Sequence, residues 1–233
     1  MNPSQNPNAA LLLSAVHKLV PLLDQIVFVG GCAAGMLITD PGAAPVRPTV
    51  DVDAIVEIAS YAELMALEGC LRQLGFEQPH VEGAPLCRWI HADVILDLMP
   101  TDPAILGFCN RWYPQALESA GTAAVGGHQI RLISAPYFLA TKLEAFHGRG
   151  QFDYGMSRDV EDIVTVVDGR AEIVAEVEQI APSLQQYLSA EFSRLLLERD
   201  FLEALPGHLL PDAVSQQRIP IVLTRMQQIV RKR

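Results

Sequence analysis

The spacing of apolar residues changes along the chain, and the change divides the sequence into two parts. The first part contains short apolar or alternating runs, which are typical of β-strands. These runs lie at residues 26–29, 49–58, 87–90, 94–99, 122–125 and 129–133. Gly126 and Gly127 separate the last two runs, which is the signature of a two-residue hairpin.

Helical spacing dominates from Ser134 to the end of the sequence. It predicts helices at residues 136–147, 158–167, about 171–180, 183–204 and 211–230. Earlier helices are expected at residues 9–23, 32–38 and 62–74, with a Pro-rich loop at 40–48. We therefore predict an α+β fold, with a strand-rich core over residues 1–133 and a helical subdomain over residues 134–233.

The composition indicates a globular protein with a sizeable core. Of the 233 residues, 50% are hydrophobic and 19% are charged. No apolar run approaches the ~20 residues that span a bilayer, and no basic segment precedes the first apolar stretch. We therefore expect a cytoplasmic protein without membrane association. Only the polar end at residues 1–8 is expected to be disordered.

Charge and cysteine usage narrow the class of protein further. The net charge of −10 opposes long-range attraction of nucleic acid, although the C-terminal end is locally basic. The four cysteines include no C-x-x-C pair, which argues against a zinc site and against a disulfide framework. We expect the cysteines to be small buried side chains.

The sequence Thr-Val-Asp-Val-Asp at residues 49–53 carries the strongest chemical signal. Side chains alternate along a strand, so Asp51 and Asp53 project from the same face. Two adjacent carboxylates repel each other at a cost that grows with burial. A divalent cation converts this repulsion into coordination, and Mg²⁺ favours carboxylates together with phosphates and water. We therefore predict that Asp51 and Asp53 bind Mg²⁺ or Mn²⁺.

A third carboxylate, Asp97, lies in the apolar run 94–99, which we expect to pair with 87–90 about a turn at His91-Ala92. A buried Asp needs a compensating partner, and a strand beside the first acidic strand would complete a site for two metal ions. Asp93 is a rival for this position, but it is expected at the turn, exposed to solvent. The prediction fails if Asp97 points away from the other carboxylates or if a fixed basic side chain fills their pocket.

Candidate phosphate ligands come from three places in the sequence. Gly30 and Gly31 lie between a strand and a helix, where free N–H groups favour an anion, although a ligand-free Gly-Gly turn fits equally well. Arg47 and Thr49 are predicted to contact the nucleotide. Arg47 either binds phosphate or neutralises the negative charge of the neighbouring aspartates. Lys142, on a predicted amphipathic helix, is either a phosphate ligand or a solvated side chain.

Five short motifs, taken in order, form a recognisable set. They are Phe-Val-Gly-Gly-Cys-Ala (28–33), Arg-Pro-Thr-Val-Asp-Val-Asp (47–53), Ile-Leu-Asp-Leu-Met-Pro (95–100), Leu-Ala-Thr-Lys-Leu-Glu-Ala-Phe (139–146) and Ser-Arg-Asp-Val-Glu-Asp-Ile (157–163). Over roughly residues 26–170, this set resembles the AbiEii/MenT-type nucleotidyltransferases. That family belongs to the DNA polymerase β-like superfamily, and its members are often toxins of toxin–antitoxin pairs.

The resemblance implies a mixed β-sheet with flanking helices, followed by a helical subdomain, with the nucleotide between them. It implies that Gly30 and Gly31 contact the triphosphate and that the three aspartates named above bind metal. It also implies that Lys142 holds phosphate and that Asp159 completes the active site from the helical part. One departure is Cys32, which stands where the superfamily pattern has Ser and puts a hydroxyl contact to phosphate in doubt.

The predicted activity is metal-dependent transfer of NMP from an NTP to an acceptor hydroxyl, with release of pyrophosphate. By resemblance, tRNA is one candidate acceptor and an antitoxin protein is one candidate partner. A first alternative keeps the fold but modifies a protein or a small molecule, which the negative net charge favours. A second alternative is a module that binds nucleotide without turnover.

Overall fold

The computed structural model describes residues 6–107, 109–149 and 153–231. Over these residues the chain forms two compact units, each described here by itself. The first unit draws on Met1–Gly35 and Arg47–Ser134, and the second on Met36–Val46 and Ala135–Arg233. In the described parts of the chain, no helix combines the length and the apolar character needed to cross a membrane.

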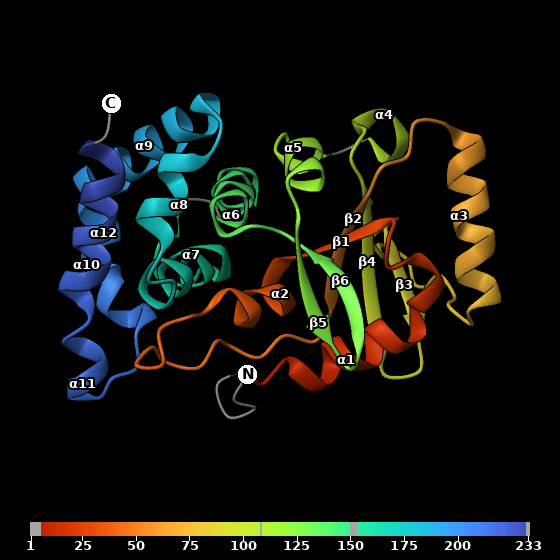
Figure 1. Ribbon diagram of the computed structural model, residues 1–233, viewed down its shortest axis with the longest axis horizontal. Coiled ribbons are helices and arrows are strands. Elements are labelled where there is room, and N and C mark those ends of the chain that lie inside the picture. The colour runs from red at the N-terminus through yellow and green to blue at the C-terminus, as the bar shows by residue number, and fades with distance from the viewer. Residues whose placement is uncertain (1–5, 108, 150–152, 232–233) are drawn as a thin grey trace. The chain divides into compact units, whose positions relative to one another are not determined.

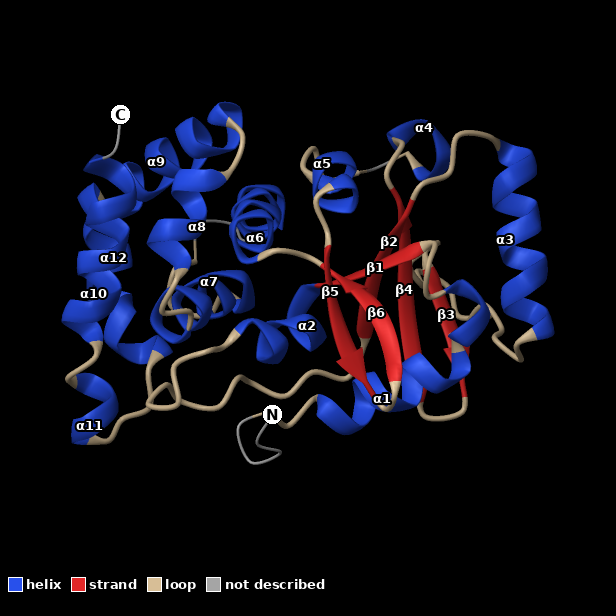
Figure 2. Cartoon of the chain, in the orientation of Figure 1, coloured by secondary structure: helices blue, strands red, loops and turns tan. Residues whose placement is uncertain are grey.

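The strands of the described residues all lie in the first unit, where six of them form one mixed sheet (Figure 2). They are β1 Ile26–Val29, β2 Val52–Val56, β3 Arg88–His91, β4 Val94–Pro100, β5 Gly121–Val125 and β6 His128–Leu132. Their order across the sheet is β3-β4-β2-β1-β6-β5. The pairs β2–β4 and β1–β6 are parallel, and the other neighbouring pairs are antiparallel.

The strand that carries Asp53 is shorter than the predicted run 49–58. Its neighbour β1 ends at Val29, which pairs with Asp53. Val52 still pairs with Leu96 on β4, and Asp51 lies just outside the strand. β2 is nevertheless buried along almost its whole length, as expected for a central strand.

Helices flank the sheet of the first unit (Figure 1). They are α1 Ala9–Lys18, the 3₁₀ turn η1 Val20–Leu22, the start of α2 Gly30–Leu37, α3 Tyr61–Gln73, α4 Pro103–Leu106 and α5 Tyr113–Glu118. The predicted helix 9–23 stops after Lys18, because Pro21 lacks a backbone N–H and the chain continues as the 3₁₀ turn. The predicted helix 32–38 instead begins at Gly30 and includes both glycines.

Among the described residues, the second unit has helices as its only regular secondary structure (Figure 2). They are α6 Ala135–Arg149, α7 Arg158–Gly169, α8 Ile173–Gln179, α9 Pro182–Leu197, α10 Arg199–Ala204, η2 Leu205–His208, α11 Ala213–Gln216 and α12 Ile219–Arg231. Aromatic side chains fill much of its core, including the fully buried Phe192 and Phe201. The predicted fold class is confirmed: a mixed sheet with flanking helices, and helices in the C-terminal part.

The segment Met36–Val46, here called the strap, belongs to the second unit although it precedes β2 in sequence. The backbone N–H groups of Thr39 and Asp40 both donate to the carbonyl of Gly169, at 2.9 Å each. Arg218 joins Asp40 at 2.6 Å and Asp168 at 2.9 Å. These contacts fix the strap to the C-terminal end of α7, so the loop between α2 and β2 belongs to the helical unit as far as Val46.

Candidate active site

The three aspartates predicted to bind metal project from one face of the central sheet. Asp53 on β2 pairs in parallel register with Asp97 on β4, so the two side chains occupy neighbouring positions. Asp97 is buried, and Asp51 and Asp53 are partly buried. Thr49 holds Asp51 in place, since its hydroxyl donates to Asp51 Oδ1 at 2.8 Å. The structure therefore brings together the carboxylates that the sequence indicated.

A basic side chain, Arg88, lies between two of these carboxylates. Its Nε and Nη2 donate to the two oxygens of Asp97 at 2.8 and 2.6 Å, and Nη2 reaches Asp51 Oδ2 at 3.4 Å. The hydrogen bonds to Asp97 raise the pKa of Arg88 above its ordinary value, so the guanidinium stays charged. A basic side chain therefore lies where an open metal pocket was required, and metal binding by these aspartates stays a prediction.

No group of three or more His, Cys, Asp or Glu side chains within residues 6–107, 109–149 and 153–231 is arranged to hold a metal ion. At the acidic cluster, a bidentate ion pair with Arg88 engages both oxygens of Asp97. The donor set itself still suits a divalent cation. It consists of hard carboxylate oxygens at aligned positions, and a positive charge already binds there.

Gly30 and Gly31, at the start of α2, lie against residues of the acidic site. A Cβ placed on Gly30 would lie 1.9 Å from Asp53 Oδ2, and Gly30 has a left-handed φ of +64°. A Cβ on Gly31 would lie 3.1 Å from Arg47 Nη2. The predicted phosphate ligands Gly31 and Arg47 are therefore neighbours, and Gly30 lets the helix start approach Asp53.

Asn8 is a positioning residue that the sequence reasoning missed. Its amide Nδ2 donates to the carbonyl oxygen of Arg47 at 3.0 Å, and its Oδ1 accepts from the backbone N–H of Thr49 at 2.9 Å. Asn6 and Asn8 are both buried, at 2% and 1% exposure, so the expected disorder of residues 1–8 does not extend to them. The sequence around Asn8 does not predict these contacts, because its partners Arg47 and Thr49 lie far away in the sequence.

We predict that Gly30→Ala lowers the nucleotidyl transfer expected from the sequence about 10²-fold, since the new methyl group would displace the Asp53 carboxylate. Gly127→Ala is the matched control. Gly127 also has a positive φ, +83°, but a Cβ there meets nothing within 4 Å. Steady-state kinetics and thermal unfolding of both variants would separate displacement from backbone strain. Equal loss of activity in the two variants would contradict the role given to Gly30.

Cys32 follows the two glycines and is buried. Burial raises the pKa of its thiol to about 12, and the charges of Asp53 and Asp51 add to the rise. We expect iodoacetamide at pH 8 to leave Cys32 unmodified in the folded protein and to modify it in urea, as measured by peptide mass spectrometry. Rapid labelling of native protein at Cys32 would contradict this assignment.

The predicted residues Lys142 and Asp159 meet inside the second unit. Lys142 Nζ lies 2.6 Å from Asp162 and 3.2 Å from Asp159, and all three residues are buried. Arg149 also binds Asp159, at 3.0 Å. Burial by itself raises the pKa of Asp159, but the hydrogen bond from Arg149 and the charges of Lys142 and Arg149 outweigh it and hold this pKa below its ordinary value. Lys142 is thus an ion-paired core residue rather than a solvated one.

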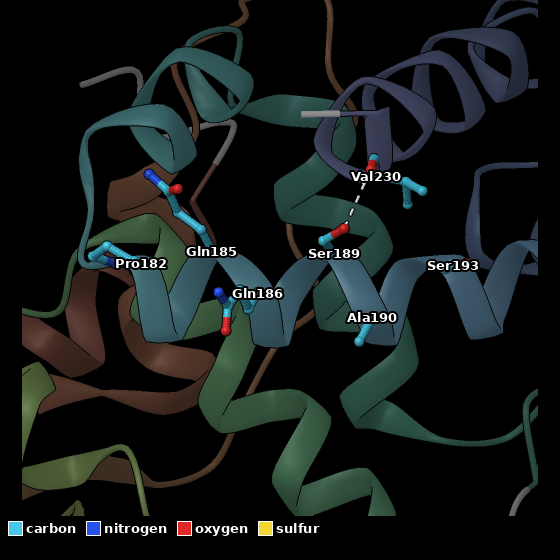
Figure 3. A pocket seen from close by; sticks show the side chains of 7 residues that line it. All are labelled: Pro182, Gln185, Gln186, Ser189, Ala190, Ser193 and Val230. Carbon is cyan, nitrogen blue, oxygen red and sulfur yellow. Dashed lines mark hydrogen bonds between the residues drawn. The ribbon is translucent and has the colours of Figure 1, made fainter. Parts of the chain in front are cut away.

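A groove of about 680 Å³ lies within the second unit, along α9 and beside the end of α12 (Figure 3). Ser189 lines it and donates a hydrogen bond to the carbonyl oxygen of Val230 at 3.2 Å (Figure 3). Its polar lining comes from glutamine and serine, and among the described residues no titratable side chain lines it. The groove therefore offers no acid–base or metal-binding group.

We compared the chain with family models, curated proteins and solved structures. No family model and no curated protein matches the chain. A nucleotidyltransferase-like antigenic protein from Paracoccidioides brasiliensis has a similar structure, with a TM-score of 0.50, 20% identity, and coverage of 85% of this chain and 94% of that one. The structure of the antibiotic-resistance factor ANT(2'')-Ia is also similar, with a TM-score of 0.50 and 16% identity. The match covers 80% of this chain and 96% of that one. At these identities the likeness is one of fold, and the chain has the fold of nucleotidyltransferase-like proteins.

Proposed function

We propose that the protein transfers a nucleoside monophosphate from an NTP to an acceptor hydroxyl, using the acidic face of the sheet. One observation carries the proposal: Asp51, Asp53 and Asp97 gather on one face beside the glycine-containing start of α2. The fold alone does not establish an activity, because one fold hosts many functions. Carboxylates placed next to backbone N–H groups are suited to a nucleotide with its divalent cation.

In this proposal Asp51, Asp53 and Asp97 hold Mg²⁺ or Mn²⁺. When bound, the metal would neutralise charge on the triphosphate and favour ionisation of the acceptor hydroxyl. Asp53 lies close to the helix start at Gly30. Asp51 is oriented by the hydroxyl of Thr49. Prealigned groups of this kind favour the reaction because they need little reorganisation.

The triphosphate is assigned to the N–H groups at Gly30 and Gly31 and to the guanidinium of Arg47. Arg47 lies beside Gly31, so a phosphate on the helix start would meet a positive charge. The roles given to Lys142 and Asp159 stay predictions that rest on the family resemblance alone. Their ion pairs show a further task, since Lys142 also neutralises two buried carboxylates of its own unit.

A second candidate function is nucleotide binding without turnover. The ion pair between Arg88 and Asp97 favours it, because a permanently paired Asp97 could not serve a metal. A module of this type would bind an NTP through Gly31 and Arg47 and release no pyrophosphate. Calorimetric binding of NTP without any pyrophosphate release, with every acceptor class present, would support this second candidate.

The test is an incubation with each α-labelled NTP, Mg²⁺ or Mn²⁺, and separate pools of RNA, protein and small hydroxyl compounds including aminoglycosides. Transfer requires label on one pool and an equal amount of pyrophosphate. The Asp53→Asn variant should neither label an acceptor pool nor release pyrophosphate. If wild type and this variant release the same pyrophosphate with every pool, the enzyme proposal is wrong.

The acceptor of the nucleoside monophosphate could belong to one of three classes: a nucleic acid, a small molecule or a protein. The family resemblance suggests tRNA, whereas one structural neighbour is an antibiotic-resistance factor, and the net charge of −10 also favours a small molecule or a protein. Binding of tRNA that strengthens steeply at low salt would favour the nucleic acid. A toxin role and an antitoxin partner rest on the resemblance alone. Slow growth on expression of wild type but not of Asp53→Asn would support them.

A further inference from the structure

We propose that Arg88 is an internal counter-ion of the acidic site, which holds Asp97 and Asp51 until a divalent cation displaces it. The inference rests on the proposed function and names a regulating residue of the same site. It predicts that metal binding to this protein is an exchange of cations rather than the filling of an open pocket. Arg88 then controls how tightly the protein binds metal.

The first argument is the geometry of the ion pair. Two guanidinium nitrogens match the two oxygens of Asp97, at 2.8 and 2.6 Å, and one of them also reaches Asp51 at 3.4 Å. A fork of this kind uses both carboxylate oxygens and is stronger than a single contact. A metal that takes Asp97 as a ligand must therefore replace at least one of these hydrogen bonds.

The second argument is the place of Arg88 in the sheet. It lies on β3, at the edge of the sheet, directly opposite Asp97 on β4. Its side chain keeps 28% exposure, against 12% for Asp97. A long side chain on an edge strand can turn into solvent without breaking the backbone ladder. Arg88 is thus a cation of the acidic site that can leave while the carboxylates stay in position.

The third argument is charge balance. The three aspartates lie close together on one face, and without a cation their mutual repulsion would destabilise the fold. Arg88 supplies a positive charge in the metal-free protein. A divalent cation would supply two charges and bind the same oxygens. Removal of Arg88 should therefore have opposite effects on stability without metal and on metal affinity.

The experiment measures Mn²⁺ binding by electron paramagnetic resonance, without nucleotide, in wild type, Arg88→Met and Arg72→Met. Arg72 is the matched control, because it lies near β3, over the Trp89 ring, and pairs with Glu68 rather than with the cluster. We expect Arg88→Met to bind Mn²⁺ about tenfold more tightly than wild type. Arg72→Met should bind as wild type does, although it loses the same charge.

Two further measurements make the test specific. The gain from Arg88→Met should disappear when Asp97→Asn is added, because the competition is for that carboxylate. In EDTA the melting temperature of Arg88→Met should be below that of wild type, and Mn²⁺ should raise it more than it raises the wild-type value. If Arg88→Met fails to fold, Arg88→Lys replaces it, since one ammonium cannot match both oxygens. A smaller gain in Mn²⁺ affinity is then expected.

Equal or weaker Mn²⁺ binding by the Arg88 variant would overturn the proposal, and so would a gain that survives Asp97→Asn. These outcomes are separate from failure of the proposed function. The Mn²⁺ measurement needs no acceptor, so a failed transfer assay leaves it informative. Conversely, pyrophosphate release by a protein whose Arg88 has no effect on Mn²⁺ affinity would retain the enzyme and reject the counter-ion.

Discussion

Asp53→Asn is expected to reduce the rate of nucleotidyl transfer about 10³-fold, the largest kinetic effect of any single change considered. The substitution keeps the size of the side chain and removes its charge. Asp53 lies between Gly30 and Asp97, so a neutral amide would weaken metal binding at the centre of the acidic face. The measurement is kcat/KM from pyrophosphate release with saturating Mg²⁺.

Asp93→Asn is the control for this prediction. Asp93 is an exposed acidic residue that contacts Ser14 and Lys18, away from the acidic cluster. Its neutralisation should leave kcat/KM within about twofold of wild type, as is usual for a surface position. If Asp93→Asn and Asp53→Asn lose the same activity, the loss reflects net charge, and the acidic face has no special role.

Lys142→Met is expected to cost about 3 kcal/mol of the free energy of unfolding, the largest stability effect that we predict. The change leaves Asp159 and Asp162 buried without the ammonium group that lies between them. Arg149 still contacts Asp159, which limits the loss. Urea unfolding at pH 7 measures it. Lys18→Met, which removes a lysine from a surface pair with Asp93, should cost less than about 1 kcal/mol.

The pH dependence of this loss gives an independent check. The pKa of Asp159 is held below its ordinary value, so the ion pairs contribute stability above the unfolded pKa and lose it as pH falls through the folded pKa. The difference between wild type and Lys142→Met should therefore shrink in acid, because protonated carboxyls need no cation. Adding Asp162→Asn should restore part of the stability at pH 7. A loss that is independent of pH would point to packing instead.

The periodicity of the sequence was sufficient to predict the fold class. It also predicted that Asp51 and Asp53 lie on the same face of their strand. β1 has the predicted bounds, and β5 and β6 flank the predicted Gly-Gly turn. Alternation placed Asp51 and Asp53 on one side because the period of a strand leaves only two choices. A buried run with one Asp indicated Asp97 because an apolar strand rarely accepts an unpaired carboxylate.

Arg88 could not be found in the same way, because its role depends on strand register. The predicted turn was His91-Ala92, whereas the chain turns at Ala92 and Asp93, and Ala92 adopts a left-handed φ of 53°. A two-residue turn at His91 and Ala92 would place Arg88 opposite Ile95 instead of Asp97. The pairing of Arg88 with Asp97 is therefore fixed by the turn, which has no glycine to mark it. Asn8 was missed for a similar reason, since its partners are distant in sequence.

The strap affects where the polypeptide can be truncated. The polypeptide passes from one unit to the other at Gly35–Met36, at Val46–Arg47 and again at Ser134–Ala135. The strap thus begins within α2 and ends directly before Arg47 in the sequence. A fragment truncated after Ser134 would retain every acidic residue of the sheet but would lose the anchors of this tether. A cut after Ser134 therefore separates the strap from the helices that hold it.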